Sequence, residues 1–410
     1  MATLESLGLL DGLVLGPRPM GEVAVTGLSD DSRQTRPGHL FAALRGVKLD
    51  GARFAPYAVR MGAVAVLTNL DGALRATEAC GGVVPVPVIV ADDPRRALAL
   101  TAARFHARQP ETTIAVTGTN GKTSVASFCR QLWTALGAPA VNLGTTGVEG
   151  AITAPLRHTT PDPIELHAML ASLAAEGVTH AAMEASSHGL AQRRVDGVQL
   201  AAGALTHISR DHLDYHEDAA DYAAAKLRLF THVLPEGAAA VVNTDDRHFA
   251  PAADIARDRR LRLIGVGEAE CADLRLLGIA YDDTGQTVRF GWQGVARKAR
   301  LGLIGGFQAH NALVACGLLI GAGADPAAVF AALPRLTGVR GRMEMVARRS
   351  NGAAIFVDYA HTPGALEAAL QALRLHTPGR LVVVFGAGGD RDPGKRPLMA
   401  EAAARFADHV

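Results

Sequence analysis

Long hydrophobic runs are absent from this sequence. No apolar stretch reaches the roughly 18–20 residues that a helix needs to cross a bilayer. The first residues, Met1–Glu5, show no basic region followed by an apolar one, so they do not resemble a secretory signal. These absences argue against a membrane protein or an exported one. We therefore expect a cytoplasmic location and no membrane partner.

Cysteine and excess charge are also scarce. The four cysteines are scattered and form no CxxC pair, which favours a reducing compartment without a structural zinc site. The formal net charge is +1, so the composition gives no sign of a nucleic-acid partner. No internal repeat or low-complexity tract is visible. With 49% hydrophobic and 20% charged residues, the 410-residue chain is typical of a globular protein of about two to four domains.

Apolar runs and helical patterns alternate along the chain and predict three domains, residues 1–97, 98–336 and 337–410. In the first, short apolar runs between turn residues predict strands alternating with helices. In the second, strands such as Thr113–Thr117 and Ala239–Asn243 alternate with helical patterns, which favours a parallel sheet covered on both faces. In the third, strands are expected at 354–358 and 381–385 and helices at 364–375 and 396–406. The expected fold class is therefore α/β.

The strongest motif is Gly118-Thr119-Asn120-Gly121-Lys122-Thr123-Ser124, between a short apolar strand and a pattern with helical spacing. Strand, glycine-rich turn and helix form the context of a phosphate loop, in which backbone N–H groups and the helix N-terminus attract phosphate oxygens. Lys122 would then reach the β- and γ-phosphates of ATP, and the Thr123 hydroxyl would hold Mg²⁺. The usual pattern has glycine where Val116 stands, so this loop is a variant. The alternative is a glycine-rich turn with a surface lysine.

Acidic and imidazole side chains follow two of the expected strands. Glu184 follows the strand expected at 180–183, at the edge where α/β folds bind ligands, and its carboxylate is suited to Mg²⁺. The alternative is a strand-end glutamate that faces solvent. The segment 206–216 holds three histidines and two aspartates; it does not fit a zinc site, because no cysteine joins it, but suits a second Mg²⁺. Lys226 lies on an expected helix and, taken alone, would be a surface lysine.

The loop at 118–123 resembles that of the Mur ligases and of their relatives, the folylpolyglutamate synthetases, and further matches follow in family order along almost the whole chain. The resemblance implies a three-domain architecture with a central ATP-binding domain and a Rossmann-like C-terminal domain. It also implies ATP and Mg²⁺ as cofactors, and a Lys226 that CO₂ converts to a carbamate. Carbamylation needs a neutral amine, so we expect a depressed Lys226 pKa. The catalytic residues implied are Lys122, Lys226 and His212, and the metal-binding residues are Thr123, Glu184, His212 and Lys226.

Three further residues match nucleotide contacts of the family, and each would otherwise be a cap or turn residue. Asn311 matches a residue over the adenine, Arg342 a phosphate contact and Asp358 a ribose ligand. An aspartate at the end of a strand is well suited to a ribose hydroxyl. The nucleotide contacts implied are Gly118, Thr119, Asn120, Gly121, Lys122, Thr123, Ser124, Asn311, Arg342 and Asp358.

Substrate contacts are implied in all three segments. Asp31-Ser32-Arg33 resembles the segment by which Mur ligases bind UDP, in a domain that folylpolyglutamate synthetases lack. Arg194 would meet an anionic group of the substrate through a bidentate fork. Residues 384–397 resemble the segment that marks the ligase adding the third peptide residue, and Arg391 would meet the carboxylate of the incoming amino acid. The substrate contacts implied are Ser32, Lys48, Leu49, His158, Thr159, Thr160, Ser186, Gln192, Arg194 and Arg391.

The activity implied is an ATP-dependent amide ligase of peptidoglycan synthesis. It would phosphorylate the D-glutamate of UDP-N-acetylmuramoyl-L-alanyl-D-glutamate and join the acyl phosphate to meso-diaminopimelate or, as second choice, to L-lysine. The alternatives are a ligase that adds the D-alanyl dipeptide, a folylpolyglutamate synthetase, and a nucleotide-binding protein without ligase activity. The family suggests a monomer.

Members of the family continue past the position of Val410, so the resemblance implies an incomplete C-terminal domain. The strand expected at 381–385 would then keep an unpaired side. We expect such a chain to bind the UDP-linked substrate but to ligate poorly.

Overall fold

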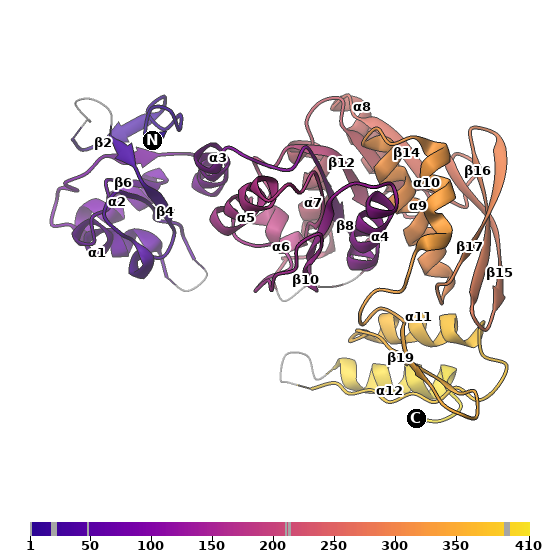
Figure 1. Cartoon of the computed structure of the whole chain (residues 1–410). Coiled ribbons are helices and arrows are strands. Elements are labelled where there is room, and N and C mark those ends of the chain that lie inside the picture. Colours follow the sequence, from indigo (N-terminus) through magenta and orange to yellow (C-terminus); the bar gives the residue numbers. More distant parts are fainter. Residues whose placement is uncertain (1, 18–22, 47–48, 210, 212–214, 389–393) are drawn as a thin grey trace. The chain divides into compact units, whose positions relative to one another are not determined.

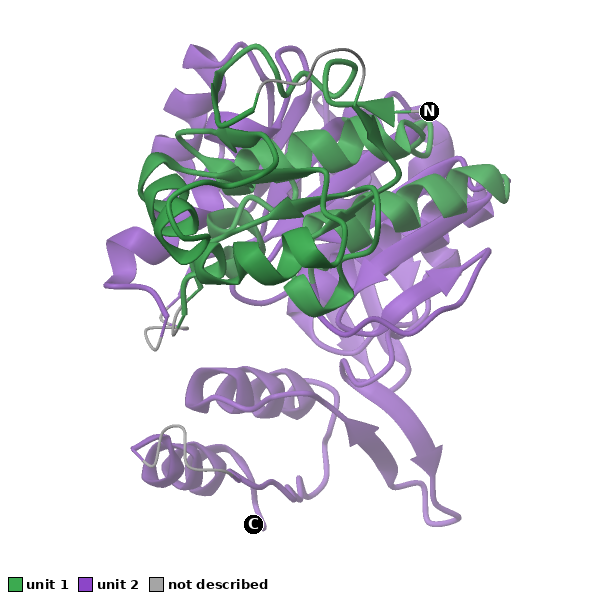
Figure 2. Ribbon diagram, turned by 90° about the vertical axis from the view of Figure 1, so that its left-hand side faces the viewer, with its two compact units in different colours: residues 1–111, 160–177, 187–199 green, residues 112–159, 178–186, 200–410 purple. Residues whose placement is uncertain are grey.

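The computed structural model describes residues 2–17, 23–46, 49–209, 211, 215–388 and 394–410 (Figure 1). The chain forms two compact units (Figure 2). The first contains residues 1–111, 160–177 and 187–199, and the second contains residues 112–159, 178–186 and 200–410. Within the described ranges, no helix combines the length and the apolar character that a membrane span requires.

A small sheet organises the first unit. Its strands lie in the order β2 (Leu13–Leu15), β7 (Val88–Val90), β6 (Ala65–Thr68), β5 (His39–Ala42) and β4 (Gly27–Ser29), and each neighbouring pair except β2–β7 is parallel. Alternate residues of a strand point to opposite faces. Leu40 and Leu67 pack with helix α3 (Pro94–His106), whereas Phe41 and Val66 pack with α1 (Ala55–Arg60) and α2 (Leu70–Ala79). The other elements of this unit are β1 (Ala2–Thr3), β3 (Ala24–Val25), η1 (Ser32–Gln34), η2 (Gly51–Phe54), α5 (Pro163–Ala175) and α6 (Ser187–Ala191).

A larger mixed sheet organises the second unit, in the order β10-β9-β11-β8-β12-β13-β14-β15-β16-β17. Its strands are β8 (Thr112–Thr117), β9 (Ala140–Gly144), β10 (Gly147–Gly150), β11 (His180–Glu184), β12 (Leu200–Leu205), β13 (Ala239–Asn243), β14 (Arg262–Gly267), β15 (Leu274–Asp282), β16 (Gly285–Trp292) and β17 (Val295–Leu301). Neighbours from β9 to β15 are parallel; β10 on β9, and the three strands β15, β16 and β17, pair antiparallel. The carboxyl ends of the adjacent strands β11, β8 and β12 therefore meet at one edge.

Helices α4 (Lys122–Ala135) and α9 (Gly306–Gly321) cover one face of this sheet, where Phe128 and Leu313 join one apolar cluster with Val116 and Val241 (Figure 1). On the opposite face, η3 (Leu229–Val233) places Leu229 over Gly203 of β12. The apolar residues expected along α4 are buried, apart from Leu136, which follows the helix and is 38% exposed. The remaining elements before the C-terminal segment are α7 (Ala219–Arg228), α8 (Phe249–Asp258), α10 (Pro326–Ala332) and η4 (Leu333–Arg335).

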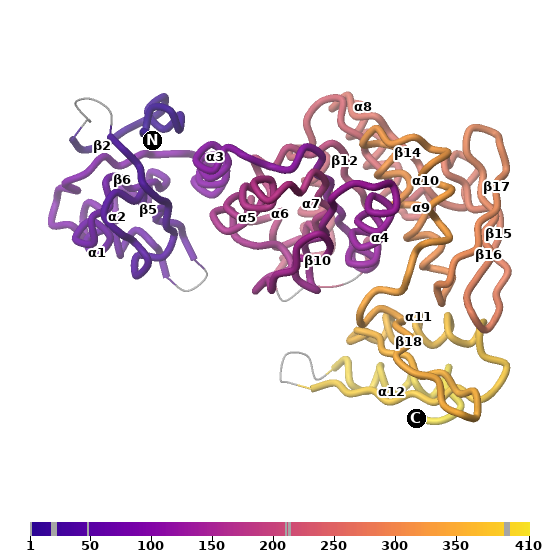
Figure 3. The backbone as a smooth tube through the Cα atoms, viewed as in Figure 1, coloured from indigo at the N-terminus to yellow at the C-terminus, as the bar shows by residue number. Residues whose placement is uncertain are grey.

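A smaller C-terminal segment follows η4 (Figure 3). It contains the antiparallel pair β18 (Glu344–Arg348) and β19 (Ala354–Val357), and helices α11 (Pro363–Arg374) and α12 (Lys395–Phe406), which share an apolar cluster. The prediction of a strand at 381–385 is wrong. Among the described residues, only Val382 of this stretch pairs, in an isolated parallel bridge with His409, and one bridge does not make the ladder that defines a strand.

The structure confirms the α/β class and the parallel-rich sheet expected for the central part of the chain. The helix expected after the phosphate loop and the strands at 113–117 and 239–243 are also present. The expected domain limits stay predictions; the one at residue 97 lies within α3.

Candidate functional site

The phosphate loop lies between the carboxyl end of β8 and the first turn of α4, as the sequence predicts. Gly118 and Gly121 have positive φ angles of 144° and 86°. An added Cβ at Gly118 would overlap the Thr206 Oγ1, and one at Gly121 would lie 2.7 Å from the Asn311 Oδ1. Gly121 caps α4 without any side-chain hydrogen bond. The loop is therefore closely packed, yet no cap side chain competes for the first amides of the helix, which suit a phosphate group.

Two residues of the β12–α7 connection fix the loop from one side. Thr206 Oγ1 donates to the Asn120 carbonyl oxygen at 2.6 Å. Thr119 Oγ1 accepts from the Ser209 amide at 3.0 Å. Both residues lie in the segment 206–216, which the sequence analysis selected for its histidines and aspartates, but their contacts with the loop were not predicted because they lie about ninety positions from it.

Lys122 lies against its own loop. Its Nζ donates to the carbonyl oxygens of Gly118 and Thr119 at 2.8 and 2.9 Å, and the side chain is half-buried. Burial lowers the Lys122 pKa, while the charge of Glu184 acts in the opposite direction and favours the ammonium form. The alternative of a freely exposed surface lysine does not describe this residue.

Lys226 lies on α7 and is 1% exposed, so the alternative of a surface helix lysine is wrong. Its Nζ donates to the same Gly118 oxygen at 2.7 Å and lies 4.5 Å from the centre of the Tyr222 ring. Burial, and then the charge of Lys122, hold the Lys226 pKa well below its ordinary value. The pKa shift has the direction that carbamylation requires.

Glu184 ends β11 and is 2% exposed, so it does not face solvent. Its Oε1 accepts from the Thr145 amide at 2.7 Å and its Oε2 from the Thr145 hydroxyl at 3.3 Å. The Thr145 hydroxyl is also 3.2 Å from that of Thr159, one of the expected substrate contacts. An added Cβ at Gly144 would overlap Glu184 Oε1, so this glycine leaves the space that the carboxylate fills.

The donors at this edge fit Mg²⁺ in chemical type. The Thr123 hydroxyl and the Glu184 carboxylate are oxygen ligands, and Mg²⁺ in phosphate sites commonly takes one or two protein oxygens together with phosphate oxygens and water. Among the described residues, no group of three or more histidine, cysteine, aspartate or glutamate side chains could hold a metal by itself. His212, the other expected ligand, lies outside the described residues, as do Lys48 and Arg391.

The expected nucleotide contacts from later in the chain lie in two places. Asn311, on α9, is buried next to Gly121, and its Nδ2 donates to Gln308 Oε1 at 3.0 Å. Arg342 reaches the loop from the C-terminal segment: its Nη2 donates to the Thr123 hydroxyl at 3.2 Å, and its Cζ lies 4.8 Å from the centre of the Tyr359 ring.

Asp358 holds the turn around Arg342. Its Oδ2 accepts from the Met343 amide and its Oδ1 from the Ala360 amide, both at 2.8 Å. Asp358 follows β19 directly, so the strand ends one residue before it. The aspartate thus has the turn role that was the alternative, and its contact with a ribose stays a prediction.

The first unit contains a pocket of about 340 Å³ that sequence reasoning missed. Four arginines from separate stretches of the chain line it, which is why no local motif revealed it: Arg45, Arg75, Arg95 and Arg193. Arg75 pairs with Asp50 and Arg193 with Asp93, each at 2.7 Å. The pocket is polar and carries both signs of charge, since aspartates lie among the arginines.

The expected substrate contacts are distributed over both units. In the first, Arg194 donates to the Thr160 carbonyl oxygen at 2.8 Å and through Nε and Nη2 to Gln192 Oε1 at 3.1 and 2.7 Å. Ser32 is buried in η1, and Leu49 is exposed. In the second, His158 is exposed and Ser186 is half-buried beyond the end of β11.

Three family models match the chain. They are the Mur ligase middle domain at residues 116–319, the Mur ligase glutamate ligase domain at residues 341–410 and the Mur ligase family catalytic domain at residues 24–106.

Curated relatives match most of the chain. A UDP-N-acetylmuramoyl-L-alanyl-D-glutamate--2,6-diaminopimelate ligase of Brucella melitensis is 50% identical over 97% of this chain and 80% of its own length. The ligase of the same name from Bradyrhizobium diazoefficiens is 52% identical over 94% of this chain and 78% of its own length.

Solved structures show the same fold. A ligase of that name is 33% identical, covers 93% of this chain and 77% of its own, and superposes with a TM-score of 0.76. MurF from Acinetobacter baumannii is 20% identical, covers 98% and 83%, and gives 0.66. A MurF ligase from Thermotoga maritima in complex with ADP is 19% identical, covers 93% and 82%, and gives 0.60. The two MurF likenesses show the fold alone.

Proposed function

Because the chain belongs to the Mur ligase family, we propose that it is an ATP-dependent amide ligase that adds meso-diaminopimelate to UDP-N-acetylmuramoyl-L-alanyl-D-glutamate in peptidoglycan synthesis. The observation that supports phosphoryl-transfer chemistry is the phosphate loop, where Lys122 and Lys226 both donate to the carbonyl oxygen of Gly118. The names of relatives that are about half identical along nearly the whole chain supply the substrates.

The proposed reaction has two steps. The D-glutamate side-chain carboxylate attacks the γ-phosphate of ATP, forming an acyl phosphate and releasing ADP. The amine of diaminopimelate then attacks the acyl carbon, forms the amide, loses a proton and releases phosphate. The loop amides and the Lys122 ammonium bind the phosphates and offset negative charge that builds up during the transfer.

The metal and the carbamate are part of the proposal. Thr123, Glu184, His212 and Lys226 would hold Mg²⁺, which when bound offsets phosphate charge. For Lys226 to take part, its neutral amine adds to CO₂ and loses a proton, which turns a neutral side chain into an anionic carbamate. Its burial supports this step because burial favours the neutral amine.

The remaining contacts follow from the family and from the pocket of the first unit. We assign the UDP part of the substrate to the arginine-lined pocket together with Ser32, Lys48 and Leu49. The muramoyl-dipeptide would meet His158, Thr159, Thr160, Ser186, Gln192 and Arg194, and the incoming amino acid would meet Arg391. Asn311, Arg342 and Asp358 complete the ATP contacts.

Further properties are proposed from the sequence patterns and from the family resemblance. L-lysine is the second choice for the added amino acid, and a monomer in the cytoplasm is the proposed state. The domain limits proposed are residues 1–97, 98–336 and 337–410. Folylpolyglutamate synthesis and addition of the D-alanyl dipeptide are the competing activities.

The decisive assay measures ADP release with each substrate withheld in turn. ADP should form only when UDP-N-acetylmuramoyl-L-alanyl-D-glutamate, diaminopimelate, ATP and Mg²⁺ are all present, and L-lysine should replace diaminopimelate poorly. Parallel reactions with a D-alanyl dipeptide and the UDP-linked tripeptide, and with glutamate and a folate, test the competing ligases. Turnover in either parallel reaction, or no dependence on the UDP-linked substrate, would overturn the proposal.

A further inference from the structure

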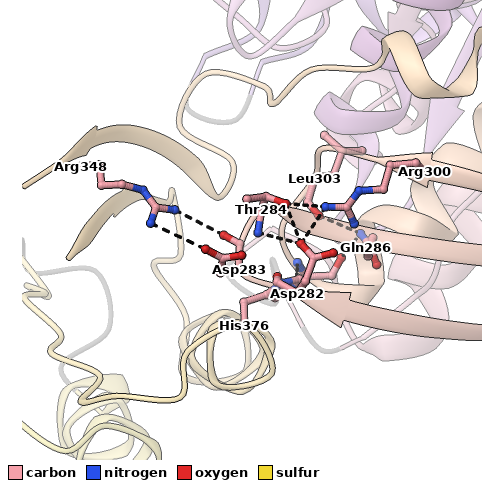
Figure 4. A network of polar contacts seen from close by, with 9 residues as sticks. Asp282, Asp283, Thr284, Gln286, Arg300, Leu303, Arg348 and His376 are labelled. Carbon is pink, nitrogen blue, oxygen red and sulfur yellow. Dashed lines mark hydrogen bonds and ion pairs between the residues drawn. The ribbon is translucent and has the colours of Figure 1, made fainter. Parts of the chain in front are cut away.

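His376 follows α11 and is a buried imidazole whose two nitrogens meet backbone groups of the preceding part of the second unit (Figure 4). Its Nε2 is 3.0 Å from the Gly305 nitrogen, and its Nδ1 is 2.7 Å from the Asp282 carbonyl oxygen. The Gly305 N–H can only donate and the Asp282 oxygen can only accept. Nε2 must therefore carry the lone pair and Nδ1 the proton, so the partners themselves select one neutral tautomer.

The two backbone partners of His376, Asp282 and Gly305, are themselves connected through Gln286. The turn between β15 and β16 begins at Asp282, and Gln286, just beyond it, donates through Nε2 to the carbonyl oxygens of Leu303 and Gly305 at 3.2 and 2.9 Å. The stretch Leu303–Gly305, which we call the α9 linker, is thus held by Gln286 from one side and by His376 from the other. Tyr281 packs edge-on against the imidazole, with ring centroids 5.1 Å apart.

The α9 linker adjoins two elements that carry expected nucleotide contacts, Asn311 on α9 and Arg342 before β18. Gly305 caps α9, the helix that carries Asn311. Ile304, one residue earlier, is buried in a small cluster with Met343, Ala369 and Ala372. Met343 directly follows Arg342, whose guanidinium reaches Thr123 of the phosphate loop. Loss of the His376–Gly305 contact is therefore expected to loosen both the start of α9 and the backbone beside Arg342.

We propose that His376 is a positioning residue for nucleotide binding: its neutral, Nδ1-protonated imidazole holds the C-terminal segment on the α9 linker and so keeps Arg342 in reach of the phosphate loop. His376 has no contact with the loop itself. Its part in nucleotide binding rests on the proposed function, whereas its bracing of the linker does not.

The carboxylates near His376 are each paired with an arginine. From β15 and its turn, Asp282 is paired with Arg300 of β17 at 2.7 Å, and Asp283 lies 3.9 Å from Arg348 of β18. On α11 itself, Arg374 is paired with Asp408 at 2.7 Å. Tyr281 is the other titratable group in contact with His376. Burial raises the pKa of Tyr281, so its hydroxyl stays neutral at physiological pH. A second proton on His376 would place an N–H of Nε2 against the N–H of Gly305, two donors without an acceptor, and the brace would be lost.

Three variants separate the two hydrogen bonds. His376→Gln can keep an acceptor for the Gly305 N–H and has no proton to gain in the physiological range. His376→Asn can keep a donor for the Asp282 oxygen but offers Gly305 nothing. His376→Phe retains the ring against Tyr281 and removes both bonds. His409→Gln, an identical change at an exposed histidine of the same segment, is the matched control.

The first readout is independent of nucleotide. Ring ¹⁵N shifts of the histidines, with His376 assigned by its loss in His376→Gln, should show a protonated Nδ1 and an unprotonated Nε2 near neutral pH. Hydrogen exchange should be faster in peptides spanning 303–311 and 340–345 for His376→Asn and His376→Phe, with little change for His376→Gln and none for His409→Gln. A protonated Nε2, or exchange unaltered in His376→Asn and His376→Phe, would overturn the inference.

The second readout is the dissociation constant of Mg·ADP measured by calorimetry at neutral pH. His376→Asn and His376→Phe should bind Mg·ADP at least roughly fivefold more weakly than the unmodified chain, whereas His376→Gln and His409→Gln should bind it nearly as tightly. Equal affinity in His376→Asn, His376→Phe and the unmodified chain would contradict the positioning role. Failure of the unmodified chain to bind Mg·ADP would instead contradict the proposed function, and with it the nucleotide part of this inference, while the ring shifts and exchange rates would still decide whether His376 braces the linker.

Discussion

At the residue scale, the site depends on two lysines that donate to one carbonyl oxygen. Lys122 and Lys226 both reach the oxygen of Gly118, at 2.8 and 2.7 Å. Two ammonium groups this close would repel each other, and the surroundings of each lysine decide which one loses its proton. Glu184 favours the charged form of Lys122, whereas Lys226 is almost fully buried and its pKa is lowered further by Lys122. These environments favour Lys122 as the cation and Lys226 as the neutral amine, which are the states that the proposed phosphate and CO₂ chemistry needs.

The stability of the chain should report the state of Lys226. The pKa of Lys226 in the folded state lies below the ordinary lysine value of 10.5, so between the two values the unfolded state binds more protons and stability rises with pH. Lys226→Met has no such group to titrate. In CO₂-free buffer, the melting temperature of Lys226→Met minus that of the unmodified chain should be largest near neutral pH and should shrink as the pH approaches 10.5. A difference that is constant with pH would show that Lys226 is not buried as a neutral amine.

Lys122→Ala should abolish turnover while the fold is retained. The variant loses the cation that meets the phosphates, and removal of one preorganised donor from such a site costs at least roughly 10²-fold in rate. Two neutral acceptors of the loop also lose a partner, each worth about 1 kcal/mol, so a modest drop in melting temperature is expected. Circular dichroism and the ADP-release assay check the two parts. Near-normal turnover would remove Lys122 from the nucleotide site.

At the element scale, the β8–α4 junction was predictable because its information is local. An apolar strand, two glycines and a helix with apolar spacing occupy consecutive positions, and the structure reproduces that order. The packing of Thr206 against Gly118 and of Asn311 against Gly121 was not predictable, because these side chains come from distant elements, although the family resemblance had named Asn311 as a nucleotide contact. The strand expected at 381–385 failed for a related reason: apolar residues favour extended backbone, but a strand also needs neighbours with which to form a ladder.

Gly118→Ala tests how much of the loop depends on close packing and how much on backbone angle. Gly118 has a positive φ and no room for a Cβ beside Thr206, whereas Gly137, just beyond α4, has a positive φ of 90° with no atom within 4 Å of an added Cβ. Both alanine variants incur backbone strain of about 1–3 kcal/mol. Only Gly118→Ala adds a steric overlap, so it should lose clearly more stability in urea unfolding and also lose Mg·ADP binding. Equal destabilisation by the two variants would mean that the loop has room to adjust.

At the scale of the whole molecule, the sequence did not reveal which segments pack together. Residues 160–177 and 187–199 belong to the first compact unit, although in sequence they lie among the strands of the second. Contacts far apart in sequence fix them there: Gln109 Nε2 donates to the Gly197 carbonyl oxygen at 2.9 Å, and His167 Nε2 lies 3.0 Å from the Asp196 carbonyl oxygen.

Arg342 joins the C-terminal segment to the phosphate loop across 219 positions of sequence. Its guanidinium donates to the Thr123 hydroxyl and stacks on the Tyr359 ring, so it lies beside the helix N-terminus at which we propose that phosphate binds. Because the loop already supplies its own amides and Lys122, we expect Arg342 to strengthen nucleotide binding more than it supports the fold.

Arg342→Ala should therefore weaken Mg·ADP binding, by about 2 kcal/mol or roughly thirtyfold, as is typical for loss of a hydrogen bond to a charged group. Arg342→Lys keeps the positive charge but loses the planar guanidinium and its stack on Tyr359. Its affinity for Mg·ADP should therefore lie between that of the unmodified chain and that of Arg342→Ala. Arg335→Ala is the matched control, since this arginine also reaches back to α4, donating to the Ala135 carbonyl oxygen at 3.1 Å at the end of the helix away from the loop. Calorimetry gives the affinities, and melting curves show whether each variant is folded. If Arg342→Ala binds Mg·ADP as tightly as Arg335→Ala does, the C-terminal segment contributes nothing to nucleotide binding through this residue, and the ATP site is complete within the elements that precede it.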